Sequence, residues 1–370
     1  MSRRWIRWMP AVAVPVVIAG VVVAIPLQAG AEPKLPVKTA HSLLAMVADS
    51  KTTAFSGTLS QTSDLGLPDL SSASGAAGTG TTTSTSGSDS SAASVLELLT
   101  GSHTARVYVD GASKQRIQVL DSMAERDVIR SGRSVWYYDS ASKKATHVTL
   151  PAASAKTATP ETSETPSTLA TKLLAAVSKK ATVSVTDNTT VAGRTAYDLV
   201  VTPNTSGTLV DSITIAVDSA TGMPLSVEVD AKNQSTPAFT LGYTKLTMGT
   251  PAASLFSFTP PADAKVTKTT LPSKGALAKR VTAAKAKAAS SKKDAPIVTG
   301  SGWSSVVELP AGAVPASVTS SPLLDELTTS VTGGRLLHSS LVNVLLTTDG
   351  RVFAGSVPVA RLQAAAAAAK

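Results

Sequence analysis

The sequence predicts a mainly β fold of the α+β class, in which about eleven antiparallel strands form one strongly curved sheet with covering helices. Three observations predict it. Apolar and polar residues alternate with a period of two in many short segments between residues 53 and 247. Turn sequences that contain glycine separate these segments. Two stretches nearby, 39–47 and 165–180, show the spacing of amphipathic helices. A sheet of this width curls into a barrel or part-barrel.

The composition limits the chemistry that the chain can carry. Of its 370 residues 43% are apolar, 16% charged and 4% aromatic, so the core is built mainly from Ala, Val, Leu and Ile. Cysteine is absent, which excludes disulfides, Cys-ligated metals and a lipidated cysteine. The histidines, at 41, 103, 147 and 338, have no metal-ligand spacing. No nucleophile elbow, H-E-x-x-H motif or P-loop occurs, so we expect neither an enzyme nor a bound metal or cofactor.

Residues 1–31 are typical of an export signal. Arginines at 3, 4 and 7 precede an uncharged apolar stretch, and Ala29-Gly30-Ala31 fits a cleavage site. The stretch Trp8–Leu27 is also long enough to span a bilayer, so a retained membrane anchor is the alternative. In either case we expect residues 32–370 to act outside the cytoplasm, in the cell envelope or secreted.

A short helix and a first strand are expected next. Thr39 is the candidate N-cap of the helix, and the strand covers residues 55–62. Residues 66–94 are rich in Gly, Ser and Thr, which indicates a low-complexity insertion rather than a phosphate-binding loop. The apolar stripe of the helix is formed by Leu43, Leu44 and Val47.

The central segment predicts short strands joined by tight turns. Residues 104–150 alternate apolar and polar side chains around the turn sequences Asp110-Gly111 and Ser131-Gly132. A second helix is expected after Thr165-Pro166, where Thr is the cap and Pro takes the first helical position. The apolar face of that helix includes Leu169, Leu173 and Val177.

The clearest alternation lies between residues 212 and 243. Ile213, Ile215 and Val217 alternate with polar residues, and after the turn at Thr221-Gly222 the pattern repeats up to residue 243. Each of these strands has one apolar and one polar face, which is typical of an antiparallel sheet with one solvated side.

The shared apolar side of the strands is the candidate binding site. Walls of Val, Leu and Ile beneath two short helices suit a lipid acyl chain, and a plain packed core is the alternative. The apolar cavity is expected to be lined by Leu43, Leu44, Val47, Phe55, Val107, Val109, Ile117, Val119, Leu169, Leu173, Val177, Ile213, Ile215, Val217, Leu225, Val227, Val229, Phe239 and Leu241.

Six runs of residues resemble one family. They are Val135–Asp139, Val148–Pro151, Tyr197–Pro203, Ile213–Asp218, Thr221–Leu225 and Leu255–Pro261. Their order is similar to that of the LolA-like lipoprotein-carrier superfamily, which includes the outer-membrane lipoprotein carrier, the mycobacterial lipid-binding lipoproteins and the N-terminal domain of MucB/RseB. The resemblance covers about residues 36–270, which we expect to form one domain.

The resemblance implies an unclosed half-barrel of antiparallel strands with helices in its concavity. It also implies non-catalytic binding of a lipid or lipoprotein acyl chain between the sheet and the helices. The alternative within the same family is an envelope regulator of the MucB/RseB type, which binds an anti-sigma factor or another membrane protein. The chain departs from the mycobacterial lipoproteins because it has no cysteine for a lipid anchor.

Positive charge is concentrated in one segment. The net charge of +9 falls to +6 without the three arginines of residues 1–31, and residues 265–293 hold nine basic and no acidic residues. We expect residues 271–295 to be either a solvated linker or a segment that binds an anionic membrane surface. Nucleic acid is not an expected partner, because the segment lacks interleaved aromatic residues. Its candidate membrane-binding cations are Lys279, Arg280, Lys285, Lys287, Lys292 and Lys293.

Residues 296–370 predict a small C-terminal α+β region. A helix is expected to begin at Ser321-Pro322, and residues 341–357 predict a β-hairpin around Thr348-Asp349-Gly350. The Ala-rich stretch from residue 363 predicts a terminal helix.

Overall fold

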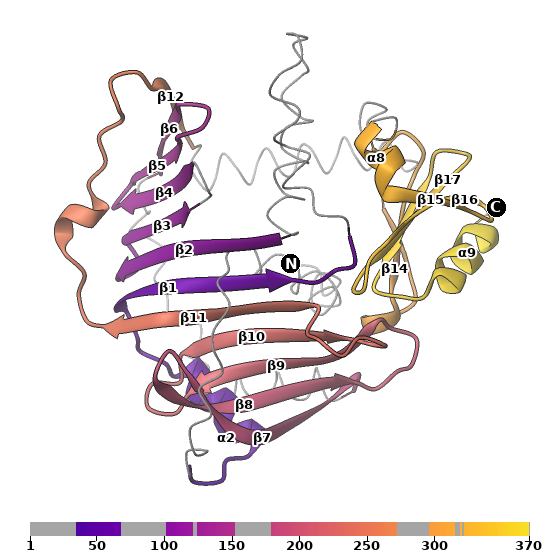
Figure 1. Cartoon of the computed structure of the whole chain (residues 1–370), viewed down its shortest axis with the longest axis horizontal. Helices are drawn as coiled ribbons and strands as arrows, with labels where there is room; N and C mark the ends of the chain where they lie inside the picture. The colour runs from indigo at the N-terminus through magenta and orange to yellow at the C-terminus, as the bar shows by residue number, and fades with distance from the viewer. Residues whose placement is uncertain are drawn as a thin grey trace.

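A computed structural model describes residues 35–67, 101–120, 124–151, 179–271, 296–314, 319 and 322–369. Residues 1–31, most of the insertion 66–94, and the candidate cavity residues Leu169, Leu173 and Val177 lie outside these ranges. So do the six candidate cations between Lys279 and Lys293. Figure 1 shows one wide sheet with a smaller sheet at one end of its strands.

Twelve strands form the large sheet, in the spatial order β12-β6-β5-β4-β3-β2-β1-β11-β10-β9-β8-β7. In the described part of the chain its two edge strands, β12 and β7, are not paired with each other, so the predicted unclosed, mainly β fold is confirmed. The strands are β1 Ala54–Ser63, β2 Gly101–Asp110, β3 Lys114–Leu120, β4 Glu125–Ser131, β5 Ser134–Asp139, β6 Lys144–Thr149, β7 Ala181–Val191, β8 Arg194–Pro203, β9 Val210–Asp218, β10 Pro224–Ala231, β11 Phe239–Met248 and β12 Lys265–Thr270.

Local sequence explains the tight turns and the curvature. Gly111 and Gly132 close the β2–β3 and β4–β5 hairpins with φ of +69° and +60°, a region that glycine enters at little cost. The pairing register shifts between Thr58 and Leu59 on β1, and again in β10 and β7. Such irregularities bend a strand and increase its twist, which helps this wide sheet to curl.

The last strand differs from the expected antiparallel pattern. β12 pairs with β6 in parallel, with Lys265 opposite Lys144. After β11 the chain crosses one face of the sheet as residues 251–264, here called the strap, and therefore reaches β6 running in the same direction. The run Leu255–Pro261, expected in the ending of the sheet, lies on this crossing and not in a strand; its first part is the short helix η2, Ala253–Phe256. Figure 1 shows the strap along the left edge, outside β3–β6.

The small sheet has six strands in the order β13-β14-β18-β17-β16-β15. The predicted hairpin is confirmed as β17–β18, in which Leu345 pairs with Phe353. The terminal helix begins earlier than residue 363, because Leu362 and Ala366 are buried against this sheet. Its elements are β13 Ile297–Thr299, η3 Gly302–Ser304, β14 Val306–Leu309, α8 Pro322–Leu327, β15 Thr328–Val331, β16 Gly334–His338, β17 Asn343–Thr347, β18 Val352–Gly355 and α9 Val359–Ala368.

None of the helices in the described ranges combines the length and the apolar character needed to cross a membrane.

Candidate functional site

The strand registers place the predicted cavity residues on one face of the large sheet. Val107 pairs with Ile117, Gln61 with Leu241, and Val227 with both Leu241 and Ile215. Because paired residues point to the same side, this face, called the apolar face below, is continuous from β3 to β9. Leu225, which lies beside a register shift, packs in the same cluster as Phe55 and Val107.

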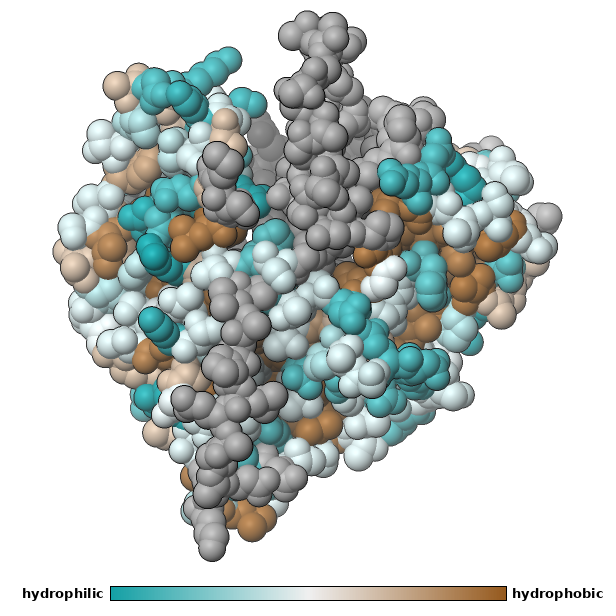
Figure 2. All heavy atoms as spheres, in the orientation of Figure 1, coloured by the Kyte–Doolittle hydropathy of each residue, from teal (hydrophilic) through white to brown (hydrophobic). Residues whose placement is uncertain are grey.

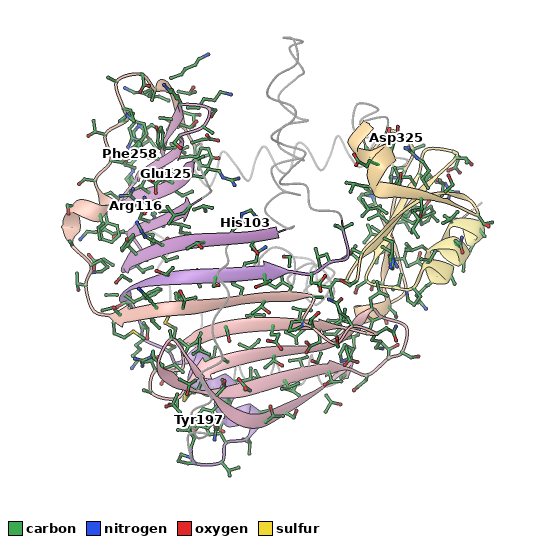
Figure 3. The ribbon with its side chains drawn as sticks, in the orientation of Figure 1. His103, Arg116, Glu125, Tyr197, Phe258 and Asp325 are labelled. Carbon is green, nitrogen blue, oxygen red and sulfur yellow. The ribbon has the colours of Figure 1, made fainter. Side chains whose placement is uncertain are left out.

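Helix α2, Ala40–Ala48, covers one part of the apolar face. The Thr39 side chain caps it by accepting a hydrogen bond from the Ser42 backbone N–H, as predicted. Its Leu43 side chain is fully buried against Tyr197, Leu199 and Val217, with Leu44 and Val47 at the margin of the cluster. Figure 3 shows Tyr197 at the end of the sheet where α2 lies. The apolar face beneath α2 is therefore a packed core.

The small sheet covers a second part of the same face. Trp303 and Leu341 pack against a cluster that contains Ile213, Val229 and Phe239. A backbone hydrogen bond joins the two sheets. The N–H of Leu209, just before β9, donates to the carbonyl of Ser356, just after β18, over 3.0 Å. The half of the apolar face formed by β8–β11 is thus filled by the protein's own side chains.

In the other half of the apolar face Phe55 and Val107 are buried, but side chains on β3–β5 are exposed. Ile117 on β3, Val128 on β4 and Tyr137 on β5 are direct cross-strand neighbours. Their exposed fractions are 45%, 41% and 42%, although all three are large and apolar. We call these three residues the exposed row. In Figure 2 the region of β3–β6, at the upper left, shows hydrophobic and hydrophilic atoms side by side.

Strands β3–β6 have their core on the opposite face, beneath the strap. Ile129 and Tyr138 are buried there, and Phe256 of the strap is buried with them. The Phe258 ring lies 5.4 Å from the ring of Tyr138 and 5.5 Å from that of Trp136, measured between centroids. The large sheet therefore buries opposite faces in its two halves, which leaves the exposed row without a protein cover among the described residues.

An ion pair lies on the face of the large sheet that the strap covers. The Arg116 guanidinium donates from Nη2 to Asp127 Oδ2 over 2.6 Å and from Nε to Oδ1 over 3.0 Å, and the Asp127 side chain is almost fully buried. The hydrogen bond to Asp127 raises the pKa of Arg116 above its ordinary value. Arg116 also donates to the Leu255 carbonyl of the strap over 3.5 Å. Figure 3 shows Arg116 and Phe258 in this part of the sheet.

Charged residues flank the exposed row on the apolar face. Arg126 and Asp139 are cross-strand partners, each two residues from a member of the row. Partial burial raises the pKa of Tyr137, the nearby Asp139 raises it further, and Arg126 opposes the shift.

In the ranges that the structure describes, no group of three or more His, Asp or Glu side chains has a metal-binding arrangement.

Sequence reasoning identified Ile117 but not its partners Val128 and Tyr137. Val128 stands between Arg126 and Arg130 in a strand with few other apolar residues, so its segment shows alternation without a clear apolar face. Tyr137 belongs to the run Val135–Asp139, in which four successive residues are apolar or aromatic and alternation is hidden. The hairpin turns determine the strand register, and this register was the signal that could have placed Val128 and Tyr137 beside Ile117.

Comparisons with known proteins give matches among solved structures. No family model matches the chain, and no curated protein matches it. The MucA/MucB complex of Pseudomonas aeruginosa is 14% identical, covers 88% of this chain and 96% of the matched chain, and has a TM-score of 0.41. An uncharacterised conserved protein of Thermus thermophilus is 12% identical over 62% of this chain and 99% of its own, with a TM-score of 0.34. A LolA superfamily protein of Nitrosomonas europaea is 11% identical over 60% of this chain and 99% of its own, with a TM-score of 0.22.

Proposed function

We propose that this chain is an exported, non-catalytic binding protein that holds a lipid or lipoprotein acyl chain against the exposed row. The observation that carries the proposal is the contrast between the two halves of the apolar face. The β8–β11 half is closed by Leu43, Trp303 and Leu341, whereas Ile117, Val128 and Tyr137 remain more than 40% exposed. Neighbouring large apolar side chains on a soluble surface mark a binding site more often than scattered ones do.

The geometry of the row suits an acyl chain. Three cross-strand neighbours in successive strands, about 5 Å apart, form a strip about 10 Å long across the sheet. A flexible hydrocarbon chain laid along this strip gains about 0.8 kcal/mol for each methylene removed from water. The row needs no reacting group for this role.

A second candidate function is that of an envelope regulator that binds an anti-sigma factor or another membrane protein. The observation that favours it is the position of the small sheet, whose Trp303 and Leu341 contact the same apolar face as the exposed row. The small sheet and the exposed row lie on the same side of the large sheet, so an extended protein segment could contact both. The partner's side chains, and not an acyl chain, would then cover the exposed row.

Mass spectrometry of organic extracts from the purified protein tests the first function. We expect acyl lipid in extracts of the wild type and its loss in the Ile117→Asp variant, because a carboxylate in the strip opposes contact with hydrocarbon. The matched control is Ile297→Asp, which changes another exposed isoleucine, on β13 in the small sheet. Extracts free of acyl lipid in the wild type, or equal loss in both variants, would contradict the proposal.

A further inference from the structure

Two lysines stand opposite each other at the open edge of the large sheet. Lys144 on β6 and Lys265 on β12 are cross-strand partners, and both are exposed. Like charges in directly opposite positions destabilise a sheet. Neither lysine forms an ion pair with a described residue, whereas the adjacent Lys143 contacts Asp263 over 2.6 Å. Among the described residues, therefore, no ion pair offsets the repulsion between these two cations.

Both lysines point to the same face as the exposed row. Tyr137 pairs with Thr146, which pairs with Thr267, and each lysine precedes one of these threonines by two residues. Tyr137 and Lys144 are therefore diagonal neighbours, about 7–8 Å apart and within reach of a long side chain. Lys265 lies one strand further from Tyr137, beside Lys144.

The other charges on this face do not neutralise the pair. Asp139 lies opposite Lys144 on β5, and its single negative charge offsets at most one of the two lysines. Arg126 lies opposite Asp139 and adds a further cation beside Val128. The apolar strip is thus bordered on one side mainly by positive charge.

We infer that the ligand of the exposed row is an anionic amphiphile, whose acyl chain lies along the row and whose phosphate or carboxylate group binds Lys144 and Lys265. The inference rests on the proposed function and names the chemical class of its ligand. An anionic group between the two ammonium groups would receive charge-assisted hydrogen bonds from both and remove their repulsion. The headgroup would then lie in solvent at the sheet edge, with the hydrocarbon on the strip.

Binding of two lipids that differ only in headgroup charge tests the inference. The probes are phosphatidylglycerol and phosphatidylcholine with the same short acyl chains, each below its micelle concentration, titrated into the purified protein. We expect the wild type to bind phosphatidylglycerol about tenfold more tightly. This preference should shrink in 1 M salt, where charges are screened within about 3 Å. The Lys144→Gln/Lys265→Gln variant should bind both lipids with the affinity that the wild type has for phosphatidylcholine.

A matched control separates this pair from general surface charge. Lys245→Gln/Lys268→Gln removes two exposed lysines that the registers place on the opposite face, and it should retain the preference. Equal affinity of the wild type for the two lipids would overturn the inference and leave the proposed function standing. Absence of binding to either lipid would overturn both. Inorganic phosphate that bound as tightly as phosphatidylglycerol would show a free-anion site and also overturn the inference.

Discussion

Replacement of Gly222 by alanine tests how closely α2 is seated on the large sheet. Gly222 has a φ of +72°, and a Cβ atom placed on it would lie 2.3 Å from the Met46 carbonyl oxygen of α2. A backbone carbonyl within a helix cannot rotate away as a side chain can. The substitution must therefore either strain the turn or lift the helix that buries Leu43.

The magnitude follows from two separate costs. A positive φ costs a residue with a Cβ about 1–2 kcal/mol relative to glycine. Overpacking against a fixed neighbour adds about 1–3 kcal/mol. We therefore expect Gly222→Ala to lower the free energy of unfolding by about 2–5 kcal/mol.

The assay is urea unfolding of the purified protein, followed by circular dichroism. Gly111→Ala is the matched control, because Gly111 has a φ of +69° and an added Cβ would meet nothing within 4 Å. The control should show only the backbone cost, about 1–2 kcal/mol. Equal destabilisation by the two substitutions would refute the close approach of α2 to the β9–β10 turn.

Two further predictions concern ion pairs in the large sheet. Asp127→Asn should lower the free energy of unfolding by about 3 kcal/mol, because it leaves the guanidinium of Arg116 largely buried without its carboxylate. Asp263→Asn, which removes an exposed pair with Lys143, should change nothing measurable, and a similar loss in both variants would contradict the reasoning. The second prediction concerns Asp218: burial opposes its ionisation, but hydrogen bonds from Arg194 and Thr221 outweigh this and lower its pKa. A lowered pKa in the folded state adds stability above the unfolded pKa of about 3.9, and this stability is lost as the pH falls through the folded value. The difference in unfolding free energy between the wild type and Asp218→Asn should therefore stay constant from about pH 7 to 5 and shrink below about pH 4; a difference independent of pH would contradict the assignment.

The period of two predicted the apolar face because that signal is local. Ile213, Ile215 and Val217 alternate with polar residues, and the structure places all three on one face with Val227 and Val229. The turn glycines were predictable for the same reason, since two neighbouring residues determine a tight hairpin. The second role of Gly222, as the contact point of α2, was not predictable because Met46 is remote in the chain.

The covering of each face was not predictable from local pattern. Phe256 and Phe258 alternate with polar residues as a strand would, yet they lie on the strap and pack over β3–β6. Pro260 and Pro261 follow them, and proline cannot donate to a strand ladder, which is the physical reason for the departure. The strap covers the face opposite Ile117, so the sequence context of Ile117 gives its face but not which face the distant strap covers.

Titration of a fluorescent acyl probe tests most directly whether the exposed row binds hydrocarbon. Val128 in the row and Val266 on the opposite face of β12 have the same exposed fraction, 41%, so the same substitution can be made at both. We predict that Val128→Asp weakens binding about tenfold, equivalent to about two methylenes returned to water, and that Val266→Asp leaves it unchanged. Equal effects of the two substitutions, or unaltered binding by Val128→Asp, would contradict the central claim.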